Sequence, residues 1–362
     1  MNPERKSGAQ IIVGSQWGDE GKGLISAYIT KRDQAAIVAR AGVGPNAEHG
    51  YFLTEQGPYI KTNQLPLGWI LNPESKIRIG SGVAVNPELL LEEIGKFGLE
   101  ERVLVDYRCP IITKNHIEAE RKSKGMQAIG STFSGSGFCR ADFILRRTQQ
   151  AQDVPELKPF LTDVSKEVNR TAEKEIVVVE SSQGTWLSLA LSPDYPNTTS
   201  DNVTAMAAGD DVGLNWQKIK EVIMVVKTLP TREGQGSLWT EELTQEEMAS
   251  RGVVEYSSIG GAIRRKGSGI NWEMLAYATE LNGATQIALT FCEHYDPKVK
   301  NVKTVDGITD RLWQLIEKVR VETGVPVTVL NTGKPYNSIV DLTGQEIDWS
   351  QVAKDLILPK EV

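Results

Sequence analysis

The segment 14–23 reads Gly-Ser-Gln-Trp-Gly-Asp-Glu-Gly-Lys-Gly and directly follows the short run Gln-Ile-Ile-Val at 10–13. Closely spaced glycines allow backbone N–H groups to approach phosphate oxygens, and the helix that follows offers its positive end. Lys22 adds a positive charge to the same loop. The segment therefore predicts a cradle for the phosphates of a ligand.

The loop departs from the common P-loop pattern at two positions. Gln16 stands where that pattern has glycine, and Gly23 stands where it has serine or threonine. An acidic pair, Asp19 and Glu20, lies inside the cradle instead. A carboxylate among phosphate-binding groups must hold a metal ion or accept a proton, because otherwise it would repel the ligand. A helix N-cap is the alternative role for Asp19, and the flanking glycines and Lys22 favour the ligand role.

A second glycine-rich loop, 40–50, contains His49 and follows the next expected strand. A lone histidine is usually a surface or hydrogen-bonded residue, but its place beside the Asp19 loop favours acid–base chemistry. A third loop, 130–137, is rich in glycine and hydroxyl groups, and a fourth, 199–204, is polar and caps a helix expected near Thr204. Three adjacent cations among glycines, at 264–266, are interpreted as a mobile loop that grips an anion. We expect His116 and His294 to be structural.

Continuous β-branched runs alternate with helical patterns along the chain, which is typical of parallel strands covered on both faces. Strands are expected at 11–13, 36–39, 77–79, 103–105, 176–179, 222–226, 287–291 and 327–330, and helices at 87–97, 272–281 and 310–319. The pattern predicts an α/β fold: a large, mostly parallel central sheet flanked by helices. Residues 1–362 are expected to form one domain with helical and loop insertions near 110–170 and 230–270. Open sheets of this class bind ligands at the carboxyl ends of their strands, and five such ends carry polar loops here.

Composition narrows the class of protein further. The chain has 362 residues, of which 40% are hydrophobic and 24% charged, and a formal net charge of −7. That charge disfavours binding of a nucleic-acid polymer, and no apolar run reaches the roughly 18 residues that span a bilayer. Three separated cysteines and three histidines predict a reducing compartment and no zinc site. We expect a cytoplasmic protein with small-molecule partners.

The first loop, together with Asn46-Ala-Glu-His49, resembles adenylosuccinate synthetase, especially its short archaeal members. The likeness covers nearly the whole chain, with the segments 129–132, 180–184, 195–200, 230–234 and 282–285 in family order. The family is a carbon–nitrogen ligase. It joins L-aspartate to C6 of a purine nucleotide through a 6-phosphoryl intermediate, with a nucleoside triphosphate and Mg²⁺, and it usually forms a homodimer.

The resemblance implies a role for individual residues of this chain. Asp19 would accept the purine N1 proton and bind Mg²⁺, His49 would donate to the transferring phosphoryl group, and Lys22 would neutralise the triphosphate. The implied triphosphate-binding residues are Ser15, Gly18, Glu20, Gly21, Gly23, Gly50, Glu293, Asn331 and Gly333. The implied purine monophosphate-binding residues are Asn46, Ser131, Thr132, Arg146, Gln183, Thr199 and Thr204, with Arg146 reaching across the dimer. Arg264 and Gly260 would bind L-aspartate, and the Glu48 backbone carbonyl would help to hold the metal.

Four departures from the family pattern bear on the substrate. Glu48 replaces a glycine, Phe291-Cys292-Glu293 replaces the segment whose aspartate selects guanine, and Ala262 replaces an arginine that reaches the ribose 2′-hydroxyl. Ser131, Ser182 and Glu233 add side-chain acceptors where plainer residues are common. A lost 2′-hydroxyl donor and extra acceptors for a 2-amino group favour dGMP over IMP.

These departures resemble the phage branch of the family, which makes aminoadenine for DNA. That branch converts dGMP, L-aspartate and ATP or dATP to N6-succino-2-amino-2′-deoxyadenylate, and a phage-encoded enzyme would act in the host cytoplasm. Many of its members carry serine in place of the catalytic aspartate, whereas Asp19 is present here. The sequence-based prediction is therefore the dGMP branch. The ordinary synthetase, which uses IMP, L-aspartate and GTP, is its alternative, and a triphosphate-hydrolysing switch is a third hypothesis.

Overall fold

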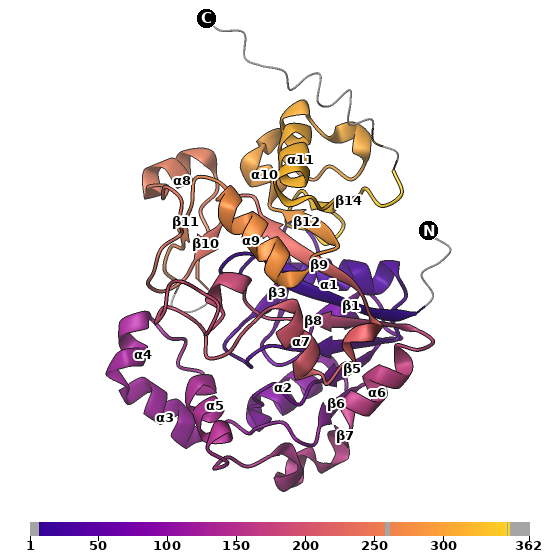
Figure 1. Cartoon of the computed structure of the whole chain (residues 1–362), viewed down its shortest axis with the longest axis vertical. Coiled ribbons are helices and arrows are strands. Elements are labelled where there is room, and N and C mark those ends of the chain that lie inside the picture. Colours follow the sequence, from indigo (N-terminus) through magenta and orange to yellow (C-terminus); the bar gives the residue numbers. More distant parts are fainter. Residues whose placement is uncertain (1–6, 258–260, 346, 348–362) are drawn as a thin grey trace, which may run out of the picture.

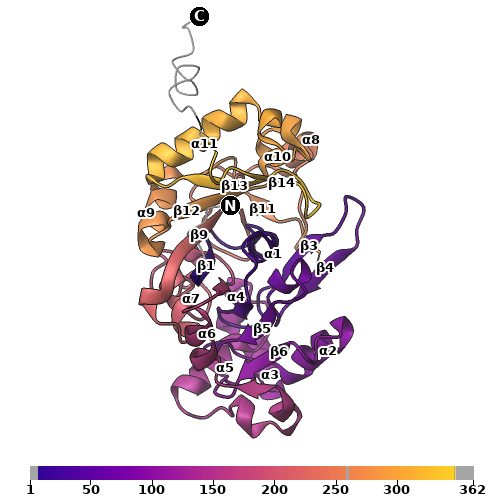
Figure 2. The same ribbon diagram turned by 90° about the vertical axis from the view of Figure 1, so that its right-hand side faces the viewer.

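The computed structural model describes residues 7–257, 261–345 and 347. Ten strands form one central sheet in the order β14-β13-β12-β9-β1-β8-β2-β5-β6-β7 (Figures 1 and 2). Every described pairing in this sheet is parallel except that of β13 with β14. The prediction of a large, mostly parallel α/β sheet is confirmed.

The strands are β1 Gly8–Gly14, β2 Ile37–Arg40, β3 His49–Phe52, β4 Tyr59–Thr62, β5 Lys76–Ile79, β6 Val103–Asp106, β7 Leu161–Thr162, β8 Ile176–Glu180, β9 Ile219–Lys227, β10 Thr231–Arg232, β11 Arg265–Lys266, β12 Gln286–Thr290, β13 Val327–Asn331 and β14 Ile339–Asp341. The α-helices are α1 Lys22–Arg32, α2 Pro87–Phe97, α3 Lys114–Lys122, α4 Lys124–Ile129, α5 Ser136–Ile144, α6 Val164–Thr171, α7 Ala205–Asp211, α8 Gln245–Arg251, α9 Trp272–Asn282, α10 Cys292–Tyr295 and α11 Asp310–Thr323. The 3-10 helices are η1 Gly68–Ile70, η2 Ala151–Asp153, η3 Pro155–Phe160, η4 Thr185–Leu187, η5 Trp216–Lys218, η6 Pro297–Val299 and η7 Val305–Gly307.

All eight expected strands and all three expected helices are present, with boundaries that differ by a few residues. The strands were predictable because their residues are buried on both faces, as in β1 and β8, where every residue is buried. The short β7 and β14 were not expected, nor were the antiparallel pairs β3–β4 and β10–β11. The division of the chain into domains stays a prediction.

Two hydrophobic cores lie on the two faces of the sheet. On one face, alternate residues of β1, β8 and β9 pack against α6, α7, α9 and α11. On the other face, the intervening residues of the same strands pack against α1 and α2. Figure 2 shows α7 and α9 on one side of the sheet and α1 and α2 on the other. Burial on both faces holds the strands rigidly, so their carboxyl ends form a stable platform for loops.

Two groups of elements extend from this platform. Helices α3, α4 and α5 form one group, and α8 with β10 and β11 forms the other; Figure 1 shows both on the left. Within the described residues, no helix is both long and apolar enough to cross a bilayer.

Glycine at 14 and at 184 allows the loops after β1 and β8 to come into close contact. A Cβ atom on Gly184 would lie closer than 3.0 Å to the backbone oxygen of Gln16 and to Glu20 Oε1. A Cβ atom on Gly14 would meet Glu20 Oε2 and the Gln183 oxygen in the same way. Because each loop directly follows a strand of the central sheet, neither loop can move away from the other without disturbing that strand.

We predict that Gly184→Ala lowers the free energy of unfolding by ~1–3 kcal/mol, because an added methyl overpacks a buried contact. The matched control is Gly95→Ala within α2, where a Cβ atom would have no neighbour within 4 Å. That change should raise the free energy of unfolding by ~0.5–1 kcal/mol, since alanine loses less entropy in a helix. Urea unfolding measures both. Equal effects of the two substitutions would contradict the close contact.

Candidate active site

The polar loops at the carboxyl ends of the strands surround one cavity of about 1550 Å³. Its walls come from the loops after β1, β2, β8, β12 and β13, from the loop between α4 and α5, and from the segment that links β10 to β11. A pocket for one small ligand typically measures ~300–1,000 Å³. This cavity therefore has room for more than one ligand.

The loop after β1 turns sharply before α1 begins. Asp19 adopts a left-handed conformation with φ 58°, between Gly18 at φ 91° and Gly21 at φ 85°. Gly21 is the N-cap residue of α1, and Lys22 is the first residue of that helix. Backbone amides, a helix N-terminus and a lysine are thus gathered on one wall of the cavity, as a phosphate cradle requires.

The carboxylate of Glu20 is buried beneath this loop. Its Oε1 accepts hydrogen bonds from the backbone N–H groups of Gln16 and Gly18, each at 3.0 Å. Its Oε2 forms an ion pair of 2.6 Å with Lys22 Nζ. Glu20 does not line the cavity. In this structure it orders the loop that carries Lys22 and the predicted catalytic Asp19.

The carboxylate of Asp19 lies in the cavity wall and forms an ion pair with Arg264. The same guanidinium reaches Glu233 Oε1 at 2.9 Å and donates to the backbone oxygen of Tyr256 at 3.2 Å. Burial lowers the pKa of Arg264 to about 10 and raises the pKa of Glu233 above its ordinary value. Arg264 therefore remains a cation at neutral pH and links two carboxylates across the cavity.

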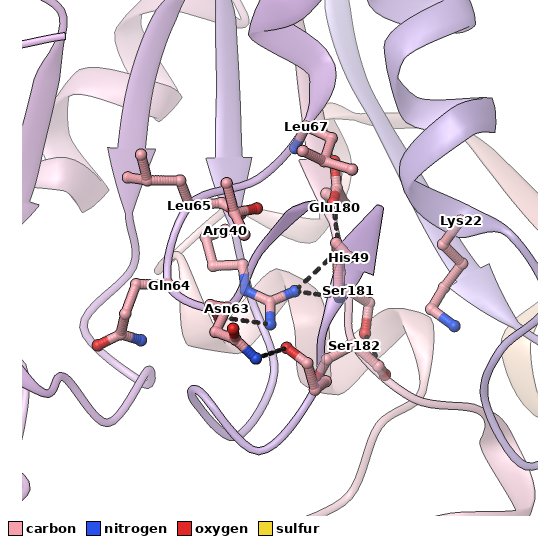
Figure 3. Close-up of polar contacts among 12 residues, drawn as sticks. Lys22, Arg40, His49, Asn63, Gln64, Leu65, Leu67, Glu180, Ser181 and Ser182 are labelled. Atoms are coloured by element: carbon pink, nitrogen blue, oxygen red, sulfur yellow. Dashed lines mark hydrogen bonds and ion pairs between the residues drawn. The ribbon is translucent and has the colours of Figure 1, made fainter. Parts of the chain in front are cut away.

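His49 lies at the start of β3, between Arg40 and Glu180 (Figure 3). Arg40 Nη1 lies 2.6 Å from His49 Nε2, and His49 Nδ1 forms a hydrogen bond with Glu180 Oε1. The other oxygen of Glu180 accepts from the backbone N–H of Leu67 at 2.9 Å. All three side chains are buried. Arg40 and Glu180 are paired residues at the carboxyl ends of the neighbouring strands β2 and β8, so the sheet itself fixes the ring of His49.

The contacts of His49 define which nitrogen carries its proton. A guanidinium can only donate, so Nε2 accepts from Arg40, and Nδ1–H donates to the carboxylate of Glu180. Burial and the positive charge of Arg40 lower the pKa of His49 to about 4. His49 is therefore a neutral imidazole at neutral pH. To donate a hydrogen bond from Nε2 to a ligand, the ring must lose its contact with Arg40 and must also gain a proton on that nitrogen.

A third group of cavity residues carries amide and hydroxyl side chains. Asn46 Nδ2 and Gln183 Nε2 both approach Thr199 Oγ1, at 3.2 and 3.0 Å. Their amide oxygens, Asn46 Oδ1 and Gln183 Oε1, are buried and make no hydrogen bond within the described residues. Ser131 Oγ donates to Glu120 Oε1 at 2.6 Å. Buried acceptors without a partner are uncommon, so the amide groups of Asn46 and Gln183, which line the cavity, are candidates for contact with a ligand.

Most of the residues expected from the sequence come together at this cavity. Those that line it are Gly18, Asp19, Gly21, Lys22, Gly23, Asn46, Glu48, His49, Gly50, Ser131, Thr132, Gln183, Thr199, Arg264, Glu293, Asn331 and Gly333. Four described residues do not line it, namely Ser15, Glu20, Arg146 and Thr204. Thr204 is the N-cap of α7, as expected from the sequence, and Arg146 is exposed. Gly260 lies outside the described residues.

The three cations at 264–266 do not form one anion-gripping loop. Arg265 pairs with Glu242, and Lys266 is buried and pairs with Glu255 at 2.5 Å. Of the three, only Arg264 lines the cavity. The sequence-based interpretation was wrong for the other two because their acidic partners lie elsewhere in the chain. His294 also differs from expectation, since it lines the cavity and its Nδ1 lies 3.3 Å from Lys266 Nζ.

Two residues of the His49 site were missed by sequence reasoning. Arg40 and Glu180 are each the last residue of an apolar strand, and a charged residue in that place was the available signal. Both are fully buried, which is unusual for an arginine or glutamate without a specific partner.

The fold and this cavity define a class of protein: an α/β enzyme with a glycine-rich loop of the phosphate-cradle type after its first strand, and with a carboxylate and a neutral imidazole beside that loop. The family model described as adenylosuccinate synthetase matches residues 11–156 and 149–299. The chain belongs to this family of carbon–nitrogen ligases.

Curated relatives agree with that assignment. The adenylosuccinate synthetase of Methanocaldococcus jannaschii is 43% identical over 340 residues, which cover 92% of this chain and 97% of the relative. That of Archaeoglobus fulgidus is 40% identical, with coverage of 94% and 100%. The expected closeness to short archaeal enzymes is confirmed.

Solved structures show the same fold at lower identity. Fully ligated adenylosuccinate synthetase from Plasmodium falciparum has a TM-score of 0.79 at 19% identity, covering 92% of this chain and 99% of that one. Cyanophage S-2L succinoaminodeoxyadenylate synthetase, bound to dGMP and to dATP as an energy donor, has a TM-score of 0.78 at 23% identity, with coverage of 97% and 99%.

We predict that ¹⁵N NMR will show His49 neutral, with its proton on Nδ1, from pH 5.5 to 8. Arg40→Met removes the nearby cation, so the imidazolium form becomes less unfavourable and the pKa of His49 should rise from about 4 toward its ordinary value. Arg40→Lys keeps the charge and is the matched control. The prediction fails if His49 titrates between pH 6 and 7 in the unmodified protein.

Proposed function

We propose that this enzyme joins L-aspartate to C6 of a purine nucleoside monophosphate at the expense of a nucleoside triphosphate, with IMP as the first candidate acceptor and GTP as the phosphoryl donor. The name shared by the 43% and 40% identical relatives supports IMP over dGMP. The preference for dGMP expected from the sequence is not confirmed, because the phage enzyme is a neighbour in fold at only 23% identity.

The single observation that carries the proposal is that Asp19, Lys22 and His49 face one cavity from two adjacent loops. Two nucleotides and an amino acid must meet there for the reaction to occur. The volume of about 1550 Å³ accommodates them together. A lone triphosphate-binding switch would not need this space, nor the second set of polar groups formed by Asn46, Gln183 and Thr199.

In the first step, Asp19 accepts the N1 proton of the purine, and the electrons move to O6. O6 attacks the γ-phosphorus, so an O6–P bond forms while the bond from phosphorus to the nucleoside diphosphate breaks. Lys22 and the backbone amides of the loop neutralise the charge that develops on the phosphates. His49 would donate to the transferred group once Arg40 releases Nε2 and that nitrogen gains a proton.

In the second step, the neutral amine of L-aspartate attacks C6 and the C6–O6 bond breaks. Phosphate leaves with O6 and carries the proton that the amine nitrogen gives up. Phosphorylation is required because an unmodified carbonyl oxygen is a very poor leaving group. Arg264 presents a planar pair of donors that suits a carboxylate of L-aspartate. It can take this role only by giving up its present contact with Asp19.

Mg²⁺ fits the donor set at this wall. Among the described residues no group of three or more His, Cys, Asp and Glu side chains could hold a metal. Magnesium commonly binds through one carboxylate together with substrate phosphates, and Asp19 with the Glu48 carbonyl would supply the protein ligands. Bound there, it would neutralise phosphate charge. The Glu48 side chain is already engaged by Lys61 at 2.8 Å, which leaves its backbone for this role.

The remaining assignments stay proposals. The triphosphate would contact Gly18, Gly21, Gly23, Gly50, Glu293, Asn331 and Gly333, and the monophosphate would contact Asn46, Ser131, Thr132, Gln183 and Thr199. Ser15, Glu20 and Thr204 would act indirectly, through the shape of the loops. A phosphate contact from Arg146 requires the homodimer, which also stays a prediction.

We predict that Asp19→Asn lowers kcat for succinylated product about 10²–10⁴-fold, because an amide cannot accept the N1 proton. Phosphate release and product are followed with IMP, L-aspartate, GTP and Mg²⁺, and each component is omitted in turn. The exposed Asp306→Asn serves as the control and should be without effect. Triphosphate hydrolysis that needs neither IMP nor L-aspartate would instead establish the switch hypothesis.

The second candidate acceptor is dGMP, and the contact between Ser131 and Glu120 favours it. Ser131 donates its only hydrogen to the buried Glu120 carboxylate, and its oxygen accepts from Phe133 N–H at 3.3 Å. A hydroxyl oxygen has two lone pairs, so one acceptor position remains for a ligand in the cavity. The second oxygen of Glu120 accepts from Gly135 N–H, so the carboxylate is held on both sides. Guanine has a 2-amino donor that such an acceptor can meet, and hypoxanthine lacks it.

The other two side-chain acceptors expected from the sequence, Glu233 and Ser182, are less available to the base than Ser131. Glu233 lines the cavity but is paired with Arg264, while Ser182 does not line it. Ala262 is exposed and also lies outside the cavity wall. The choice between IMP and dGMP therefore depends chiefly on Ser131.

We predict that Ser131→Ala lowers the ratio of kcat/KM for dGMP to that for IMP about tenfold to a hundredfold, since a buried 2-amino group would lose its acceptor. Glu120→Gln should act in the same direction. Its amide oxygen must serve Gly135 N–H, so its NH₂ group faces Ser131 and turns that hydroxyl into a donor. An unchanged ratio in both variants would rule out a role for Ser131 in reading the base.

A further inference from the structure

The segment after β10 brings a carboxylate to the place where the proposed purine and amino-acid sites meet. Glu233 directly follows β10 and lines the cavity. The next residue, Gly234, packs against the end of α4, since a Cβ atom there would lie 2.7 Å from the Ile129 backbone oxygen. The loop that begins at this point carries Ser131, which is proposed to contact the base. Glu233 also contacts Arg264, the proposed partner of L-aspartate.

The position of Glu233 is fixed by contacts of the residues on both sides of it. The preceding residue, Arg232, is buried and forms an ion pair with Asp194. After it, the backbone oxygen of Gly234 accepts a hydrogen bond from Arg265 Nη1 at 3.2 Å. The carboxylate of Glu233 therefore has a defined place in the cavity wall.

The hydrogen-bonding capacity of this carboxylate is only partly used. Its Oε1 is buried and lies 2.9 Å from Arg264 Nη2, but it accepts no hydrogen bond within the described residues. The side chain of Ser257 forms a hydrogen bond with the same carboxylate. Buried polar atoms rarely lack a partner, so Oε1 is a candidate for contact with a ligand that carries N–H groups.

Glu233 and Arg264 together have the charges that complement an amino acid, which carries an ammonium and a carboxylate on one carbon atom. Arg264 contacts Asp19 through Nη1 and Glu233 through Nη2. If the α-carboxylate of L-aspartate takes the place of Asp19 on Nη1, the contact with Glu233 is retained. The ammonium group can then lie beside the Glu233 carboxylate, and both charges of the amino acid are paired.

Ligation also requires a group that removes a proton from this ammonium. An ammonium nitrogen has no free electron pair, so it cannot attack C6 until one of its N–H bonds breaks. Under the proposed function, Asp19 takes the N1 proton of the purine instead. His49 is a weak base, because its pKa is lowered to about 4 by burial and by Arg40. Glu233 is the carboxylate that remains next to Arg264.

The surroundings of Glu233 make it a stronger base than an exposed glutamate. Burial raises its pKa, and the negative charge of Glu48 acts in the same direction, while the hydrogen bond with Ser257 acts against both. A raised pKa lies closer to that of an ammonium group, which favours transfer of a proton from the ammonium to the carboxylate.

We propose that Glu233 binds the ammonium group of L-aspartate and accepts one of its protons, which frees the amine to attack C6. In this step an N–H bond of the ammonium breaks and an O–H bond forms on Glu233. The electron pair left on nitrogen forms the bond to C6 as O6 leaves with phosphate, and the second proton lost by nitrogen departs with that phosphate. Glu233 then releases its proton to solvent. The proposal rests on the proposed function for the identity of the amino acid.

Binding of L-aspartate and of succinate, measured by calorimetry, tests the ammonium contact. Succinate has both carboxylates of L-aspartate but no ammonium group. With IMP, GDP and Mg²⁺ present, phosphoryl transfer cannot occur, and we expect L-aspartate to bind at least tenfold more tightly than succinate. Glu233→Gln should reduce this ratio about tenfold. The control Glu241→Gln changes an exposed residue outside the cavity wall and should leave the ratio unchanged.

The pH dependence of kcat/KM for L-aspartate tests the proton transfer. In Glu233→Gln only L-aspartate with a neutral amine can react, and this fraction rises about tenfold per pH unit below the pKa of the amine. The unmodified enzyme uses the abundant ammonium form. The ratio of kcat/KM for the unmodified enzyme to that for Glu233→Gln should therefore fall about tenfold per pH unit from pH 7 to 8.5. Asp19, Glu48 and Arg264 are present in both enzymes, so their own titration cancels in this ratio.

A third variant and the possible outcomes complete the test. Glu233→Asp still accepts a proton and should keep the pH profile of the unmodified enzyme at a lower rate. An unchanged succinate ratio in Glu233→Gln would overturn the ammonium contact, and a kcat/KM ratio that is constant from pH 7 to 8.5 would overturn the proton transfer. Either result, with ligation intact, leaves the proposed function standing. Binding of L-aspartate over succinate that depends on Glu233, without ligation, would refute the proposed function and support the ammonium contact.

Discussion

The shape of the site depends on the buried carboxylate of Glu20. It collects two backbone N–H groups and the ammonium of Lys22 under the loop after β1, and it fits there because Gly14 and Gly184 have no side chains. The backbone oxygen of Glu20 also accepts from Thr290 Oγ1 at 2.6 Å, which ties the loop to β12. With both neighbours of Asp19 fixed, that residue is held in a left-handed conformation with its carboxylate at the cavity wall. The carboxylate of Glu20, which does not line the cavity, thus determines where the carboxylate of Asp19, which does, is placed.

Buried charged side chains recur beneath the cavity, and the ones described next each lie beside a residue of opposite charge. Arg40 with Glu180 and Lys227 with Glu255 stand where strands β2, β8 and β9 end or where a loop crosses them. Buried ion pairs contribute little net stability, because desolvation offsets their attraction. Their effect here is instead to set the position and the protonation state of a group that faces the cavity. Arg40 and Glu180 do this for His49.

The sheet and the main loops were predictable because they depend on local sequence. Buried strands read as continuous apolar runs, and glycine-rich loops follow them, so Asp19 and His49 could be placed at one edge from their order alone. The hydrogen bonds and ion pairs between side chains that lie far apart in the sequence could not be predicted from the order of the motifs. Glu180 was seen only as the end of a strand, because its partner His49 lies more than a hundred residues away. Lys266 was assigned to an anion-gripping loop, because its partner Glu255 lies more than ten residues away. The short pair β10–β11 was missed for a different reason: strands of two residues are too short to show a hydrophobic periodicity.

The contact of Arg264 with Asp19 links the charges of three residues at the cavity wall. The guanidinium neutralises part of the negative charge of both Asp19 and Glu233. Any ligand that draws Arg264 away leaves Asp19 with an uncompensated negative charge, which then attracts a cation. Under the proposed function, binding of an anionic amino acid and binding of a divalent ion would therefore be linked by electroneutrality, even though the two need never touch.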